Sequence, residues 1–384
     1  MTTSTVHSQL VPTKSTDKII GVLTLNRGAQ LNSLDLDMVR TLSSQLQQWQ
    51  DDEQVVAVVI QGDSHRAFCA GGDLNALYQS MRDHNSQQDP WGNTYGRDFF
   101  AEEYRLDHVI HCYPKPIVAL GFGILMGGGV GVFAGASHRV VAPQTRYAMP
   151  EIVIGLFPDV AGSWILSRLP AGIGHTLAMT GANINGADVY YLGLADYLYD
   201  EGTQSQSIVD ALVDADWGLC PYAACSAALT QFHQPSLAKL GQLVPHYERL
   251  RNLGTQPDFA HLCQQFADWG QDDSAKAVND PWLKKAGQQF IAGSPMSIRL
   301  SYELLRLNRH RSLAQAFQTD FNVAMQCLVH GDFQEGIRAL IIDKDRQPQW
   351  QHEHVLAPTQ QEVQAFLRPA QPKDSLHPLH DLAN

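Results

Sequence analysis

Two glycine-rich loops, each lying between a strand-like run and a helix-like run, constrain the fold of this chain most strongly. The first covers residues 69–73 and follows the β-branched run at residues 55–60. The second covers residues 126–131 and follows the run at Ile117–Leu120. Glycines at such places let the backbone approach a ligand and turn its N–H groups outward. Either loop alone is typical of a tight turn, but the pair also suits convergence on one oxygen atom.

The hydrophobic pattern divides the chain into an α/β part and a helical part. Residues 18–25, 55–60 and 117–120 have the short apolar runs of buried strands, and an apolar stripe every three or four residues predicts a helix at 35–50. After about residue 200 the strand pattern disappears. We expect a flexible segment at 1–17, an α/β core at 18–203, a helical region at 204–350 and a polar tail at 351–384. The helices predicted in the second half are residues 207–215, 237–251, 295–306 and 313–329.

Composition and charge disfavour several kinds of partner and location. The 384 residues carry a formal net charge of -12, which disfavours nucleic acid and anionic membranes as partners. Six scattered cysteines without paired spacing indicate reduced thiols, and the first eighteen residues lack the apolar stretch of a signal peptide. No run is long enough to span a membrane. We therefore expect a cytoplasmic protein of bacterial type, while a trimmed organelle precursor would have the same sequence features.

The second glycine loop also fits a different function. Gly129, Gly131 and Ala134 match the G-x-G-x-x-A pattern of a dinucleotide-binding turn. That interpretation requires an acid after the next strand, to bind a ribose hydroxyl. The next strand candidate, His138–Val141, is followed by residues 142–144, which are Ala, Pro and Gln. The dinucleotide hypothesis therefore ranks below the oxygen-binding one.

An acidic loop follows the glycine loops. The segment AMPEIVIGLFPD places Glu151 and Asp159 eight residues apart among Met, Ile, Leu and Phe. Carboxylates in apolar surroundings are costly unless they are paired or used. Taken separately, each has an ordinary explanation, because Glu favours the first turn of a helix and Asp favours Pro-Asp turns.

The order of these motifs resembles the crotonase, or enoyl-CoA hydratase/isomerase, superfamily. The matching segments are LNRGAQLNSL, AFCAGGDL, MGGGVG and MPEIVIGLFPD, within residues 19–198. The later segment HGDFQEGIRALIIDKDRQPQW, residues 330–350, resembles the end of one branch, the 3-hydroxyisobutyryl-CoA hydrolases. The resemblance implies a crotonase-like spiral of ββα units followed by a helical C-terminal region.

The resemblance also implies roles for named residues. The backbone amides of Gly72 and Gly128 would form an oxyanion hole, in which one such donor typically contributes on the order of 3 kcal/mol to the transition state. Hydratases of this superfamily carry an acid where this chain has Gly131, whereas Asp159 and its FPD triplet resemble the hydrolase branch. Glu151 and Asp159 are therefore the predicted catalytic residues.

A third acid is predicted to contact the substrate. Glu103 lies on the expected helix 99–111, on a stripe with Phe99, Phe100 and Leu106. Its charged neighbours Glu102 and Arg105, taken alone, indicate an acid on the exposed surface of the helix. The segment FFAEEY, however, resembles a helix of the hydrolase branch that supplies a substrate-contacting Glu.

The expected activity is hydrolysis of an acyl-CoA thioester, with 3-hydroxyisobutyryl-CoA as the substrate implied by the resemblance, as in valine catabolism. Glu151 would attack the carbonyl or deprotonate a water, and Asp159 would bind the 3-hydroxyl. Two alternatives stay open: an enoyl-CoA hydratase or isomerase of the same fold, and a non-catalytic acyl-CoA-binding protein. We expect no cofactor beyond the CoA of the substrate, and no metal, because His352, Glu353 and His354 lie in a polar tail. The resemblance implies a homo-oligomer, a trimer or a multiple of it.

Overall fold

The computed structural model describes residues 4–15, 17–84, 89–218, 220–254, 258–271 and 279–382. The chain divides into two compact units that are discontinuous in sequence, whereas consecutive segments were expected. Unit 1 comprises Met1–Gly72, Leu106–Tyr147 and Ile184–Pro245. Unit 2 comprises Asp73–Arg105, Ala148–Asn183 and His246–Asn384.

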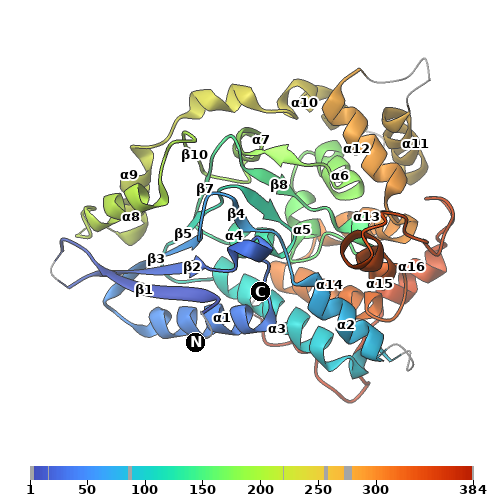
Figure 1. Ribbon diagram of the computed structural model, residues 1–384, viewed down its shortest axis with the longest axis horizontal. Coiled ribbons are helices and arrows are strands. Elements are labelled where there is room, and N and C mark those ends of the chain that lie inside the picture. Colours follow the sequence, from blue (N-terminus) through green and yellow to red (C-terminus); the bar gives the residue numbers. More distant parts are fainter. Residues whose placement is uncertain are drawn as a thin grey trace. The chain divides into compact units, whose positions relative to one another are not determined.

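Unit 1 is built on two sheets (Figure 1). One has six strands in the order β1-β2-β3-β5-β7-β10, and the other has four in the order β4-β6-β8-β9. The strands are β1 (Val6–Pro12), β2 (Ile19–Leu25), β3 (Val55–Gly62), β4 (Ala67–Cys69), β5 (Ile117–Leu120), β6 (Ile124–Met126), β7 (His138–Val141), β8 (Arg146–Ala148), β9 (Ile184–Asn185) and β10 (Tyr197–Leu198).

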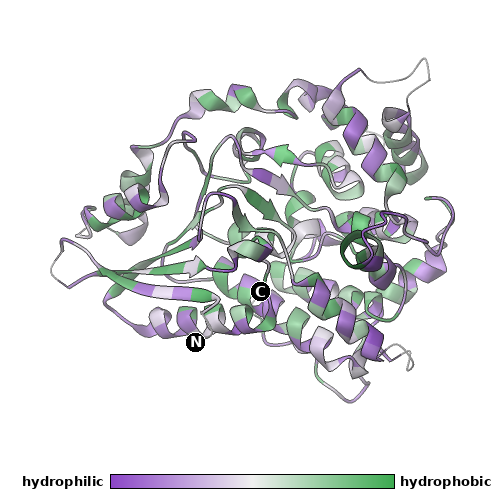
Figure 2. Ribbon diagram, viewed as in Figure 1, coloured by the Kyte–Doolittle hydropathy of each residue, from purple (hydrophilic) through white to green (hydrophobic). Residues whose placement is uncertain are grey.

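The predicted strands are confirmed and form the centre of the larger sheet. β3 pairs in parallel with β2 on one side and β5 on the other, with Val58 opposite both Gly21 and Ile117. Residues on both faces of β3 are buried, as a near-continuous apolar run in a parallel sheet requires. These strands are among the most hydrophobic parts of unit 1 (Figure 2).

The N-terminal segment is a correction to the expectation of a flexible 1–17. Val6–Pro12 forms strand β1, which pairs antiparallel with β2 from Val6 opposite Leu25 to Pro12 opposite Ile19. Most of its side chains are exposed, so the apolar pattern gives little sign of a strand. Backbone hydrogen bonds to the edge of β2 hold the segment instead.

In the described residues the last strand is β10, and the chain after it is helical, as the hydrophobic pattern predicts. Within unit 1 the helices are α1 (Leu36–Asp51), α4 (Gly128–Ala134), α7 (Gly186–Tyr191), α8 (Ser205–Val213) and α9 (Pro221–Thr230). Helix α3 (Thr94–His111) contributes to both units. Unit 2 also contains α2 (Leu74–His84), α5 (Gly162–Leu166), α6 (Ala171–Thr180), α10 (Tyr247–Leu253), α11 (Phe259–Gly270), α12 (Pro281–Ala292), α13 (Pro295–Asn308), α14 (Leu313–Cys327), α15 (Phe333–Ile337) and α16 (Gln360–Phe366).

Two predicted segments of the helical part differ in detail. The helix expected at 237–251 is two short 3-10 turns, Pro235–Leu240 and Val244–His246, followed by α10. The tail at residues 351–384, expected to be polar, contains α16, whose Val363 is fully buried. Across the described ranges, no helix is long and apolar enough to cross a membrane.

Candidate active site

The two glycine loops lie side by side in unit 1 because their strands are neighbours. β4 and β6 pair in parallel, with Cys69 opposite Leu125, so the loops leave the same edge of the smaller sheet. A methyl group added at Gly71 would lie 3.7 Å from the Gly128 nitrogen. Gly71 has φ 112 and Gly127 has φ 52, both in the left-handed region that favours glycine. The loops therefore bring the predicted amide donors of Gly72 and Gly128 close together.

Backbone hydrogen bonds and one close approach at a glycine fix the position of the two loops. The Leu34 amide donates to the Gly71 carbonyl at 2.8 Å, and the Ala70 amide donates to the Leu31 carbonyl at 3.1 Å. A side chain at Gly129 would overlap the carbonyl oxygen of Cys69, so α4 approaches β4 only because this residue is glycine. Among the described residues, neither the Gly72 N–H nor the Gly128 N–H donates a hydrogen bond to a backbone carbonyl of a loop or strand.

Glu151 is the first residue of a 3-10 turn, Glu151–Ile154, in unit 2. Its side chain is 4% exposed, and its Oε2 atom has no hydrogen-bond partner within the part of the chain that the structure describes. The turn ends at Gly155, where φ is 76 and where any side chain would overlap the Asp332 backbone. The turn packs against α12, α13 and α15, so the late helices fix the position of this acid.

Asp159 begins a turn with an unusual backbone. Val160 and Ala161 have φ 49 and φ 59, left-handed values that cost non-glycine residues on the order of 1 to 3 kcal/mol each. The Ala161 amide donates to Asp320 Oδ2 at 2.9 Å, and Asp320 is fully buried on α14. The buried carboxylate thus holds the strained turn that positions Asp159.

Tyr104 of α3 contacts the acid directly. Its hydroxyl donates to Asp159 Oδ2 at 2.7 Å, and both side chains are buried. The Tyr104 ring lies against Phe317 of α14, with centroids 6.0 Å apart. Helices α3 and α14 and the Asp159 turn therefore meet at one point of unit 2.

Burial and mutual repulsion set the protonation of these acids. Burial, and then the negative charge of Asp159, raise the pKa of Glu151 well above its ordinary value. Burial raises the pKa of Asp159 to about 6, opposed by the Tyr104 hydrogen bond. Burial and the Asp159 charge raise the pKa of Asp320 well above its ordinary range.

Glu103 lies in the same unit and is buried, with 2% of the residue exposed. Its charge contributes to raising the pKa of Tyr104, after burial, Asp159 and Asp320. The surface location suggested by its neighbours alone is therefore wrong. Its substrate contact stays a prediction.

Tyr104 and Asp320 are site residues that the sequence argument missed. Tyr104 is the last residue of the FFAEEY segment, in which only Glu103 was predicted to have a role. Asp320 lies three residues after Phe317 and four before Ala324, on the apolar stripe of α14. An acid on such a stripe is the same signal that drew attention to Glu103.

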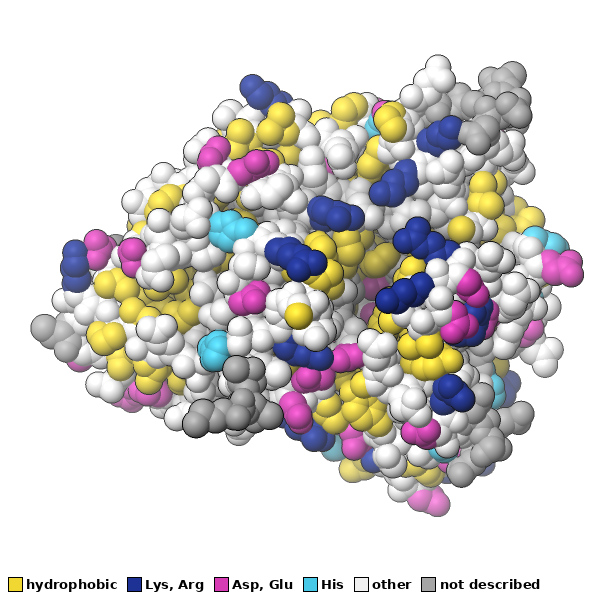
Figure 3. All heavy atoms as spheres, in the orientation of Figure 1, with side chains coloured by type: hydrophobic (Ala, Val, Ile, Leu, Met, Phe, Trp, Pro, Cys, Tyr) yellow, Lys and Arg dark blue, Asp and Glu magenta, His cyan; other side chains and the backbone are white. Residues whose placement is uncertain are grey.

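Unit 2 also contains a cavity of about 420 Å³ beside the Glu151 turn. Val153 of that turn lines it, together with Lys285 of α12 and Arg346. In Figure 3, Lys and Arg side chains gather over the part of the molecule where α12 and α15 lie. The remaining lining residues are Gln288, Gln289, Ala292, Gly336, Ala339, Leu340 and Pro348.

A metal centre finds no support in the residues described. No group of three or more His, Cys, Asp and Glu side chains in those ranges is arranged to hold an ion. His352 instead lies 3.2 Å from Glu362 Oε1.

Comparisons with known proteins identify the family of this chain. The family model described as enoyl-CoA hydratase/isomerase matches residues 20–367. The chain is 33% identical to "3-hydroxyisobutyryl-CoA hydrolase, mitochondrial" of Danio rerio, over 90% of this chain and 88% of that protein. The protein of the same name from Gallus gallus is 35% identical over 86% and 81% of the two chains.

Two solved structures have the same fold over almost their whole length. One is a carnitinyl-CoA dehydratase from Mycobacterium thermoresistibile, with a TM-score of 0.79 and 30% identity, covering 95% of this chain and 97% of that one. The other is an enoyl-CoA hydratase from Rhodobacter sphaeroides 2.4.1, with a TM-score of 0.77 and 31% identity, covering 95% and 98%. The predicted crotonase-like fold is confirmed.

Proposed function

Because this chain belongs to the enoyl-CoA hydratase/isomerase family, we propose that it hydrolyses the thioester of 3-hydroxyisobutyryl-CoA to 3-hydroxyisobutyrate and CoA. The observation that carries the proposal is the buried pair of Glu151 and Asp159, the latter bound by Tyr104. Gly131 on α4 lies where the family's hydratases have a second acid, and that loss favours hydrolysis over water addition.

The oxyanion hole supplies the first part of the mechanism. The amides of Gly72 and Gly128 donate hydrogen bonds to the carbonyl oxygen of the thioester, and they stabilise the negative charge that develops there as the carbonyl carbon is attacked. The resemblance to the family, rather than a distance, supports a joint role for these amides and the acids of unit 2.

Glu151 supplies the second part by one of two routes. It deprotonates a water whose oxygen attacks the carbonyl carbon, or its carboxylate attacks and water then hydrolyses the resulting anhydride. In the first route the C–S bond breaks as the proton that Glu151 took from water passes to the CoA sulfur. In the second route the sulfur leaves as a thiolate when the anhydride forms, and it takes a proton released by the water that hydrolyses the anhydride. Only ionised Glu151 does this chemistry, so its raised pKa predicts activity that grows as the pH rises. Asp159 accepts the 3-hydroxyl of the acyl chain, and Glu103 contacts the same substrate.

The cations of the cavity beside the Glu151 turn are proposed to bind the phosphates of CoA. Lys285 and Arg346 both line this cavity, and Val153 on its wall is two residues from Glu151. A phosphate needs such cations, because each charge-assisted hydrogen bond to an anion is about twice as strong as a neutral one.

Hydration of an enoyl-CoA is the second candidate. The observation in its favour is that the two solved structures with the same fold are named as a dehydratase and a hydratase. A non-catalytic acyl-CoA-binding protein is disfavoured, because binding alone gives no reason to bury two repelling acids.

The discriminating experiment supplies the protein with 3-hydroxyisobutyryl-CoA and follows free thiol, and in parallel supplies crotonyl-CoA and follows loss of the enoyl absorbance. Release of CoA with slow hydration supports the proposal. Rapid hydration without thiol release assigns the chain to the hydratases, and inactivity on both supports acyl-CoA binding alone.

Variants test the assigned acid. Glu151→Gln should reduce thiol release by about 10³-fold or more while CoA binding persists, since it removes the group that attacks or activates water. Glu362→Gln changes a partly exposed glutamate on α16 in the same way and should retain wild-type rates. Near-normal turnover of Glu151→Gln would exclude this residue from the mechanism.

Location and assembly complete the proposal. The cytoplasm was expected from the sequence, while the curated relatives are named as mitochondrial. A homo-oligomer follows from the resemblance alone, and sedimentation of the purified chain measures its mass.

A further inference from the structure

The guanidinium of Arg338, directly after α15, ties that helix to the segment that returns along the cavity of about 420 Å³. It forms a bidentate pair with Glu335, Nε to Oε2 and Nη2 to Oε1, both at 2.8 Å. Its Nη1 atom lies 2.6 Å from Asp343 Oδ2 and 2.7 Å from Asp345 Oδ2. One cation therefore holds three acids, and a bidentate pair within a network is the kind of surface ion pair that fixes a geometry.

These contacts use every N–H group of the Arg338 side chain. A guanidinium has five N–H donors. Glu335 accepts two of them, and the two on Nη1 go to Asp343 and Asp345. The Gln347 carbonyl oxygen, 3.2 Å from Nη2, accepts the fifth. Arg338 therefore acts on the chain rather than on a ligand.

The residues on both sides of Arg346 are bound by this one side chain. Arg338 holds Asp345 by its carboxylate and Gln347 by its carbonyl oxygen. The Gln347 amide also donates to Asp345 Oδ1 at 2.9 Å. Between them, the Arg346 amide donates to the Ala339 carbonyl at 3.0 Å, and both of these residues line the cavity. The contacts that place Arg346 at the cavity thus converge on Arg338 and the turn that follows it.

The backbone at Arg346 has a conformation that needs such support. Its φ is 56, and φ is 58 at Lys344, so two non-glycine residues in this short segment are left-handed. Left-handed non-glycine residues persist only where the surrounding contacts over-determine them, and they are frequent at ligand-binding sites. Arg338 supplies contacts on both sides of Arg346.

The same ion pairs keep two acids away from Arg346. Asp345 is its neighbour in the chain, and Asp343 lies three residues before it. An unpaired carboxylate so close would compete with a phosphate for the Arg346 guanidinium. Both acids are paired with Arg338 instead, and Arg346 forms no ion pair with an acid in the described ranges. Its charge is therefore available to a ligand.

We infer that Arg338 is a positioning residue for CoA recognition, because it holds Arg346 at the cavity and keeps Asp343 and Asp345 from pairing with it. This inference rests on the proposed binding of the CoA phosphates by Lys285 and Arg346. The affinity of the cavity for CoA then depends on a residue that touches no part of the ligand.

Calorimetric titration of the full chain with CoA tests this role and needs no hydrolysis. Arg338→Gln should weaken CoA binding about tenfold, because Arg346 loses its position and gains two competing acids. Unchanged affinity in this variant overturns the inference.

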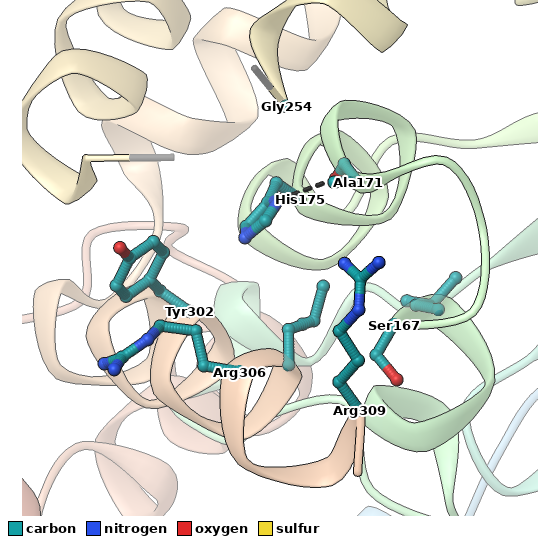
Figure 4. Close-up of a pocket in the computed structure, with 9 residues that line it drawn as sticks. Ser167, Ala171, His175, Gly254, Tyr302, Arg306 and Arg309 are labelled. Carbon is teal, nitrogen blue, oxygen red and sulfur yellow. Dashed lines mark hydrogen bonds between the residues drawn. The ribbon is translucent and has the colours of Figure 1, made fainter. Parts of the chain in front are cut away.

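Arg306→Gln is the matched control. Arg306 is paired with Glu303, three residues earlier, as Arg338 is paired with Glu335. It lines a separate cavity of about 180 Å³ beside α13 (Figure 4). Its replacement should change the affinity for CoA by less than about twofold. A loss equal to that of Arg338→Gln would mean that any such arginine affects CoA binding, and would overturn the inference.

Asp345→Asn separates positioning from charge alone. Removing an acid beside a phosphate site strengthens phosphate binding if the acid acts only by its charge. Asp345 accepts from both Arg338 and the Gln347 amide, whereas an asparagine side chain has one oxygen and serves only one of them. We therefore expect CoA binding weaker by about threefold or more. Equal or tighter binding overturns the inference, and this exposed substitution also covers the case in which Arg338→Gln fails to fold.

A double variant shows whether Arg338 acts through Arg346. In that case Arg338→Gln combined with Arg346→Gln should bind CoA within about threefold of Arg346→Gln alone. Losses that multiply would mean that Arg338 acts on the ligand independently, and would overturn the inference. A loss in Arg346→Gln with none in Arg338→Gln rejects the positioning role and keeps the cavity as the phosphate site, whereas no loss in either variant rejects both.

Discussion

The hydroxyl of Tyr104 donates a hydrogen bond to Asp159 Oδ2 at 2.7 Å, and both residues are buried. The bond connects α3 to the turn that follows the Glu151 segment. It favours the ionised form of Asp159 against the burial that opposes it. Tyr104 is thus a positioning residue for one of the two acids proposed to act in hydrolysis.

Removing that hydroxyl should shift the pH dependence of activity. In Tyr104→Phe the pKa of Asp159 rises further, so kcat/KM should reach its maximum only at a higher pH than in the wild type. At pH 7, kcat/KM of the variant should therefore be about tenfold lower. Tyr113→Phe is a matched control, because Tyr113 is also buried and donates to the Leu46 carbonyl at 2.7 Å. If kcat/KM of Tyr104→Phe rises with pH over the same range as in the wild type, this hydrogen bond does not set the pKa of Asp159.

Replacing Asp159 should stabilise the protein while it removes activity. Burial raises the pKa of Asp159 to about 6 from its ordinary 3.8, so the folded state binds this proton more tightly than the unfolded state does. The wild type therefore loses stability as the pH rises from about 3.8 through about 6. Asp159→Asn lacks this loss of stability, so its free energy of unfolding should exceed that of the wild type by up to about 3 kcal/mol at pH 8 but not at pH 3.5.

Urea unfolding at the two pH values measures the effect. The exposed Asp214, paired with Lys14, supplies the comparison through Asp214→Asn. A gain in Asp159→Asn that is equal at both pH values would contradict the assigned cause.

The two variants of Asp320 should differ in stability. Asp320→Asn keeps an oxygen that accepts from the Ala161 amide, whereas Asp320→Ala leaves that buried N–H unsatisfied, at a cost of about 1 to 3 kcal/mol. The strained backbone at Val160 would then relax and move Asp159. Thermal unfolding and kcat should both be lower in Asp320→Ala than in Asp320→Asn, and equal values for the two would refute the tethering role.

Two glycine substitutions should separate backbone conformation from close packing. Gly155 and Gly193 have similar φ values, 76 and 73, so alanine at either costs about 1 kcal/mol for the left-handed conformation. A side chain at Gly155 also overlaps the Asp332 backbone, whereas nothing lies within 4 Å at Gly193. Denaturant unfolding should show Gly155→Ala to be the more destabilised by about 1 to 3 kcal/mol. Equal losses would mean that the close approach to α15 is unimportant.

Neutralising the cavity beside the Glu151 turn should weaken recognition of CoA alone. The double variant Lys285→Gln, Arg346→Gln should raise KM for an acyl-CoA about tenfold or more and reduce its dependence on salt. The matching acyl-pantetheine, which has no phosphates, should be hydrolysed equally by the variant and the wild type. A parallel loss on both substrates would show that these cations act on something other than the phosphates.

Much of the fold was accessible from local sequence patterns. The apolar runs of β2, β3 and β5 and the stripe of α14 follow from side-chain periodicity, because burial on a strand or helix face repeats with the backbone. Strand β1 was missed, since its mostly exposed side chains carry no such repeat and only backbone hydrogen bonds to β2 hold it.

The sequence by itself determined which groups were available: glycines after two adjacent strands, and acids in an apolar loop. Only the tertiary structure decided which groups meet. Tyr104 reaches Asp159 across 55 residues, and the Ala161 amide reaches Asp320 across 159. Periodicity states that a residue faces inward but not what it faces, and the protonation of a buried acid depends on those neighbours.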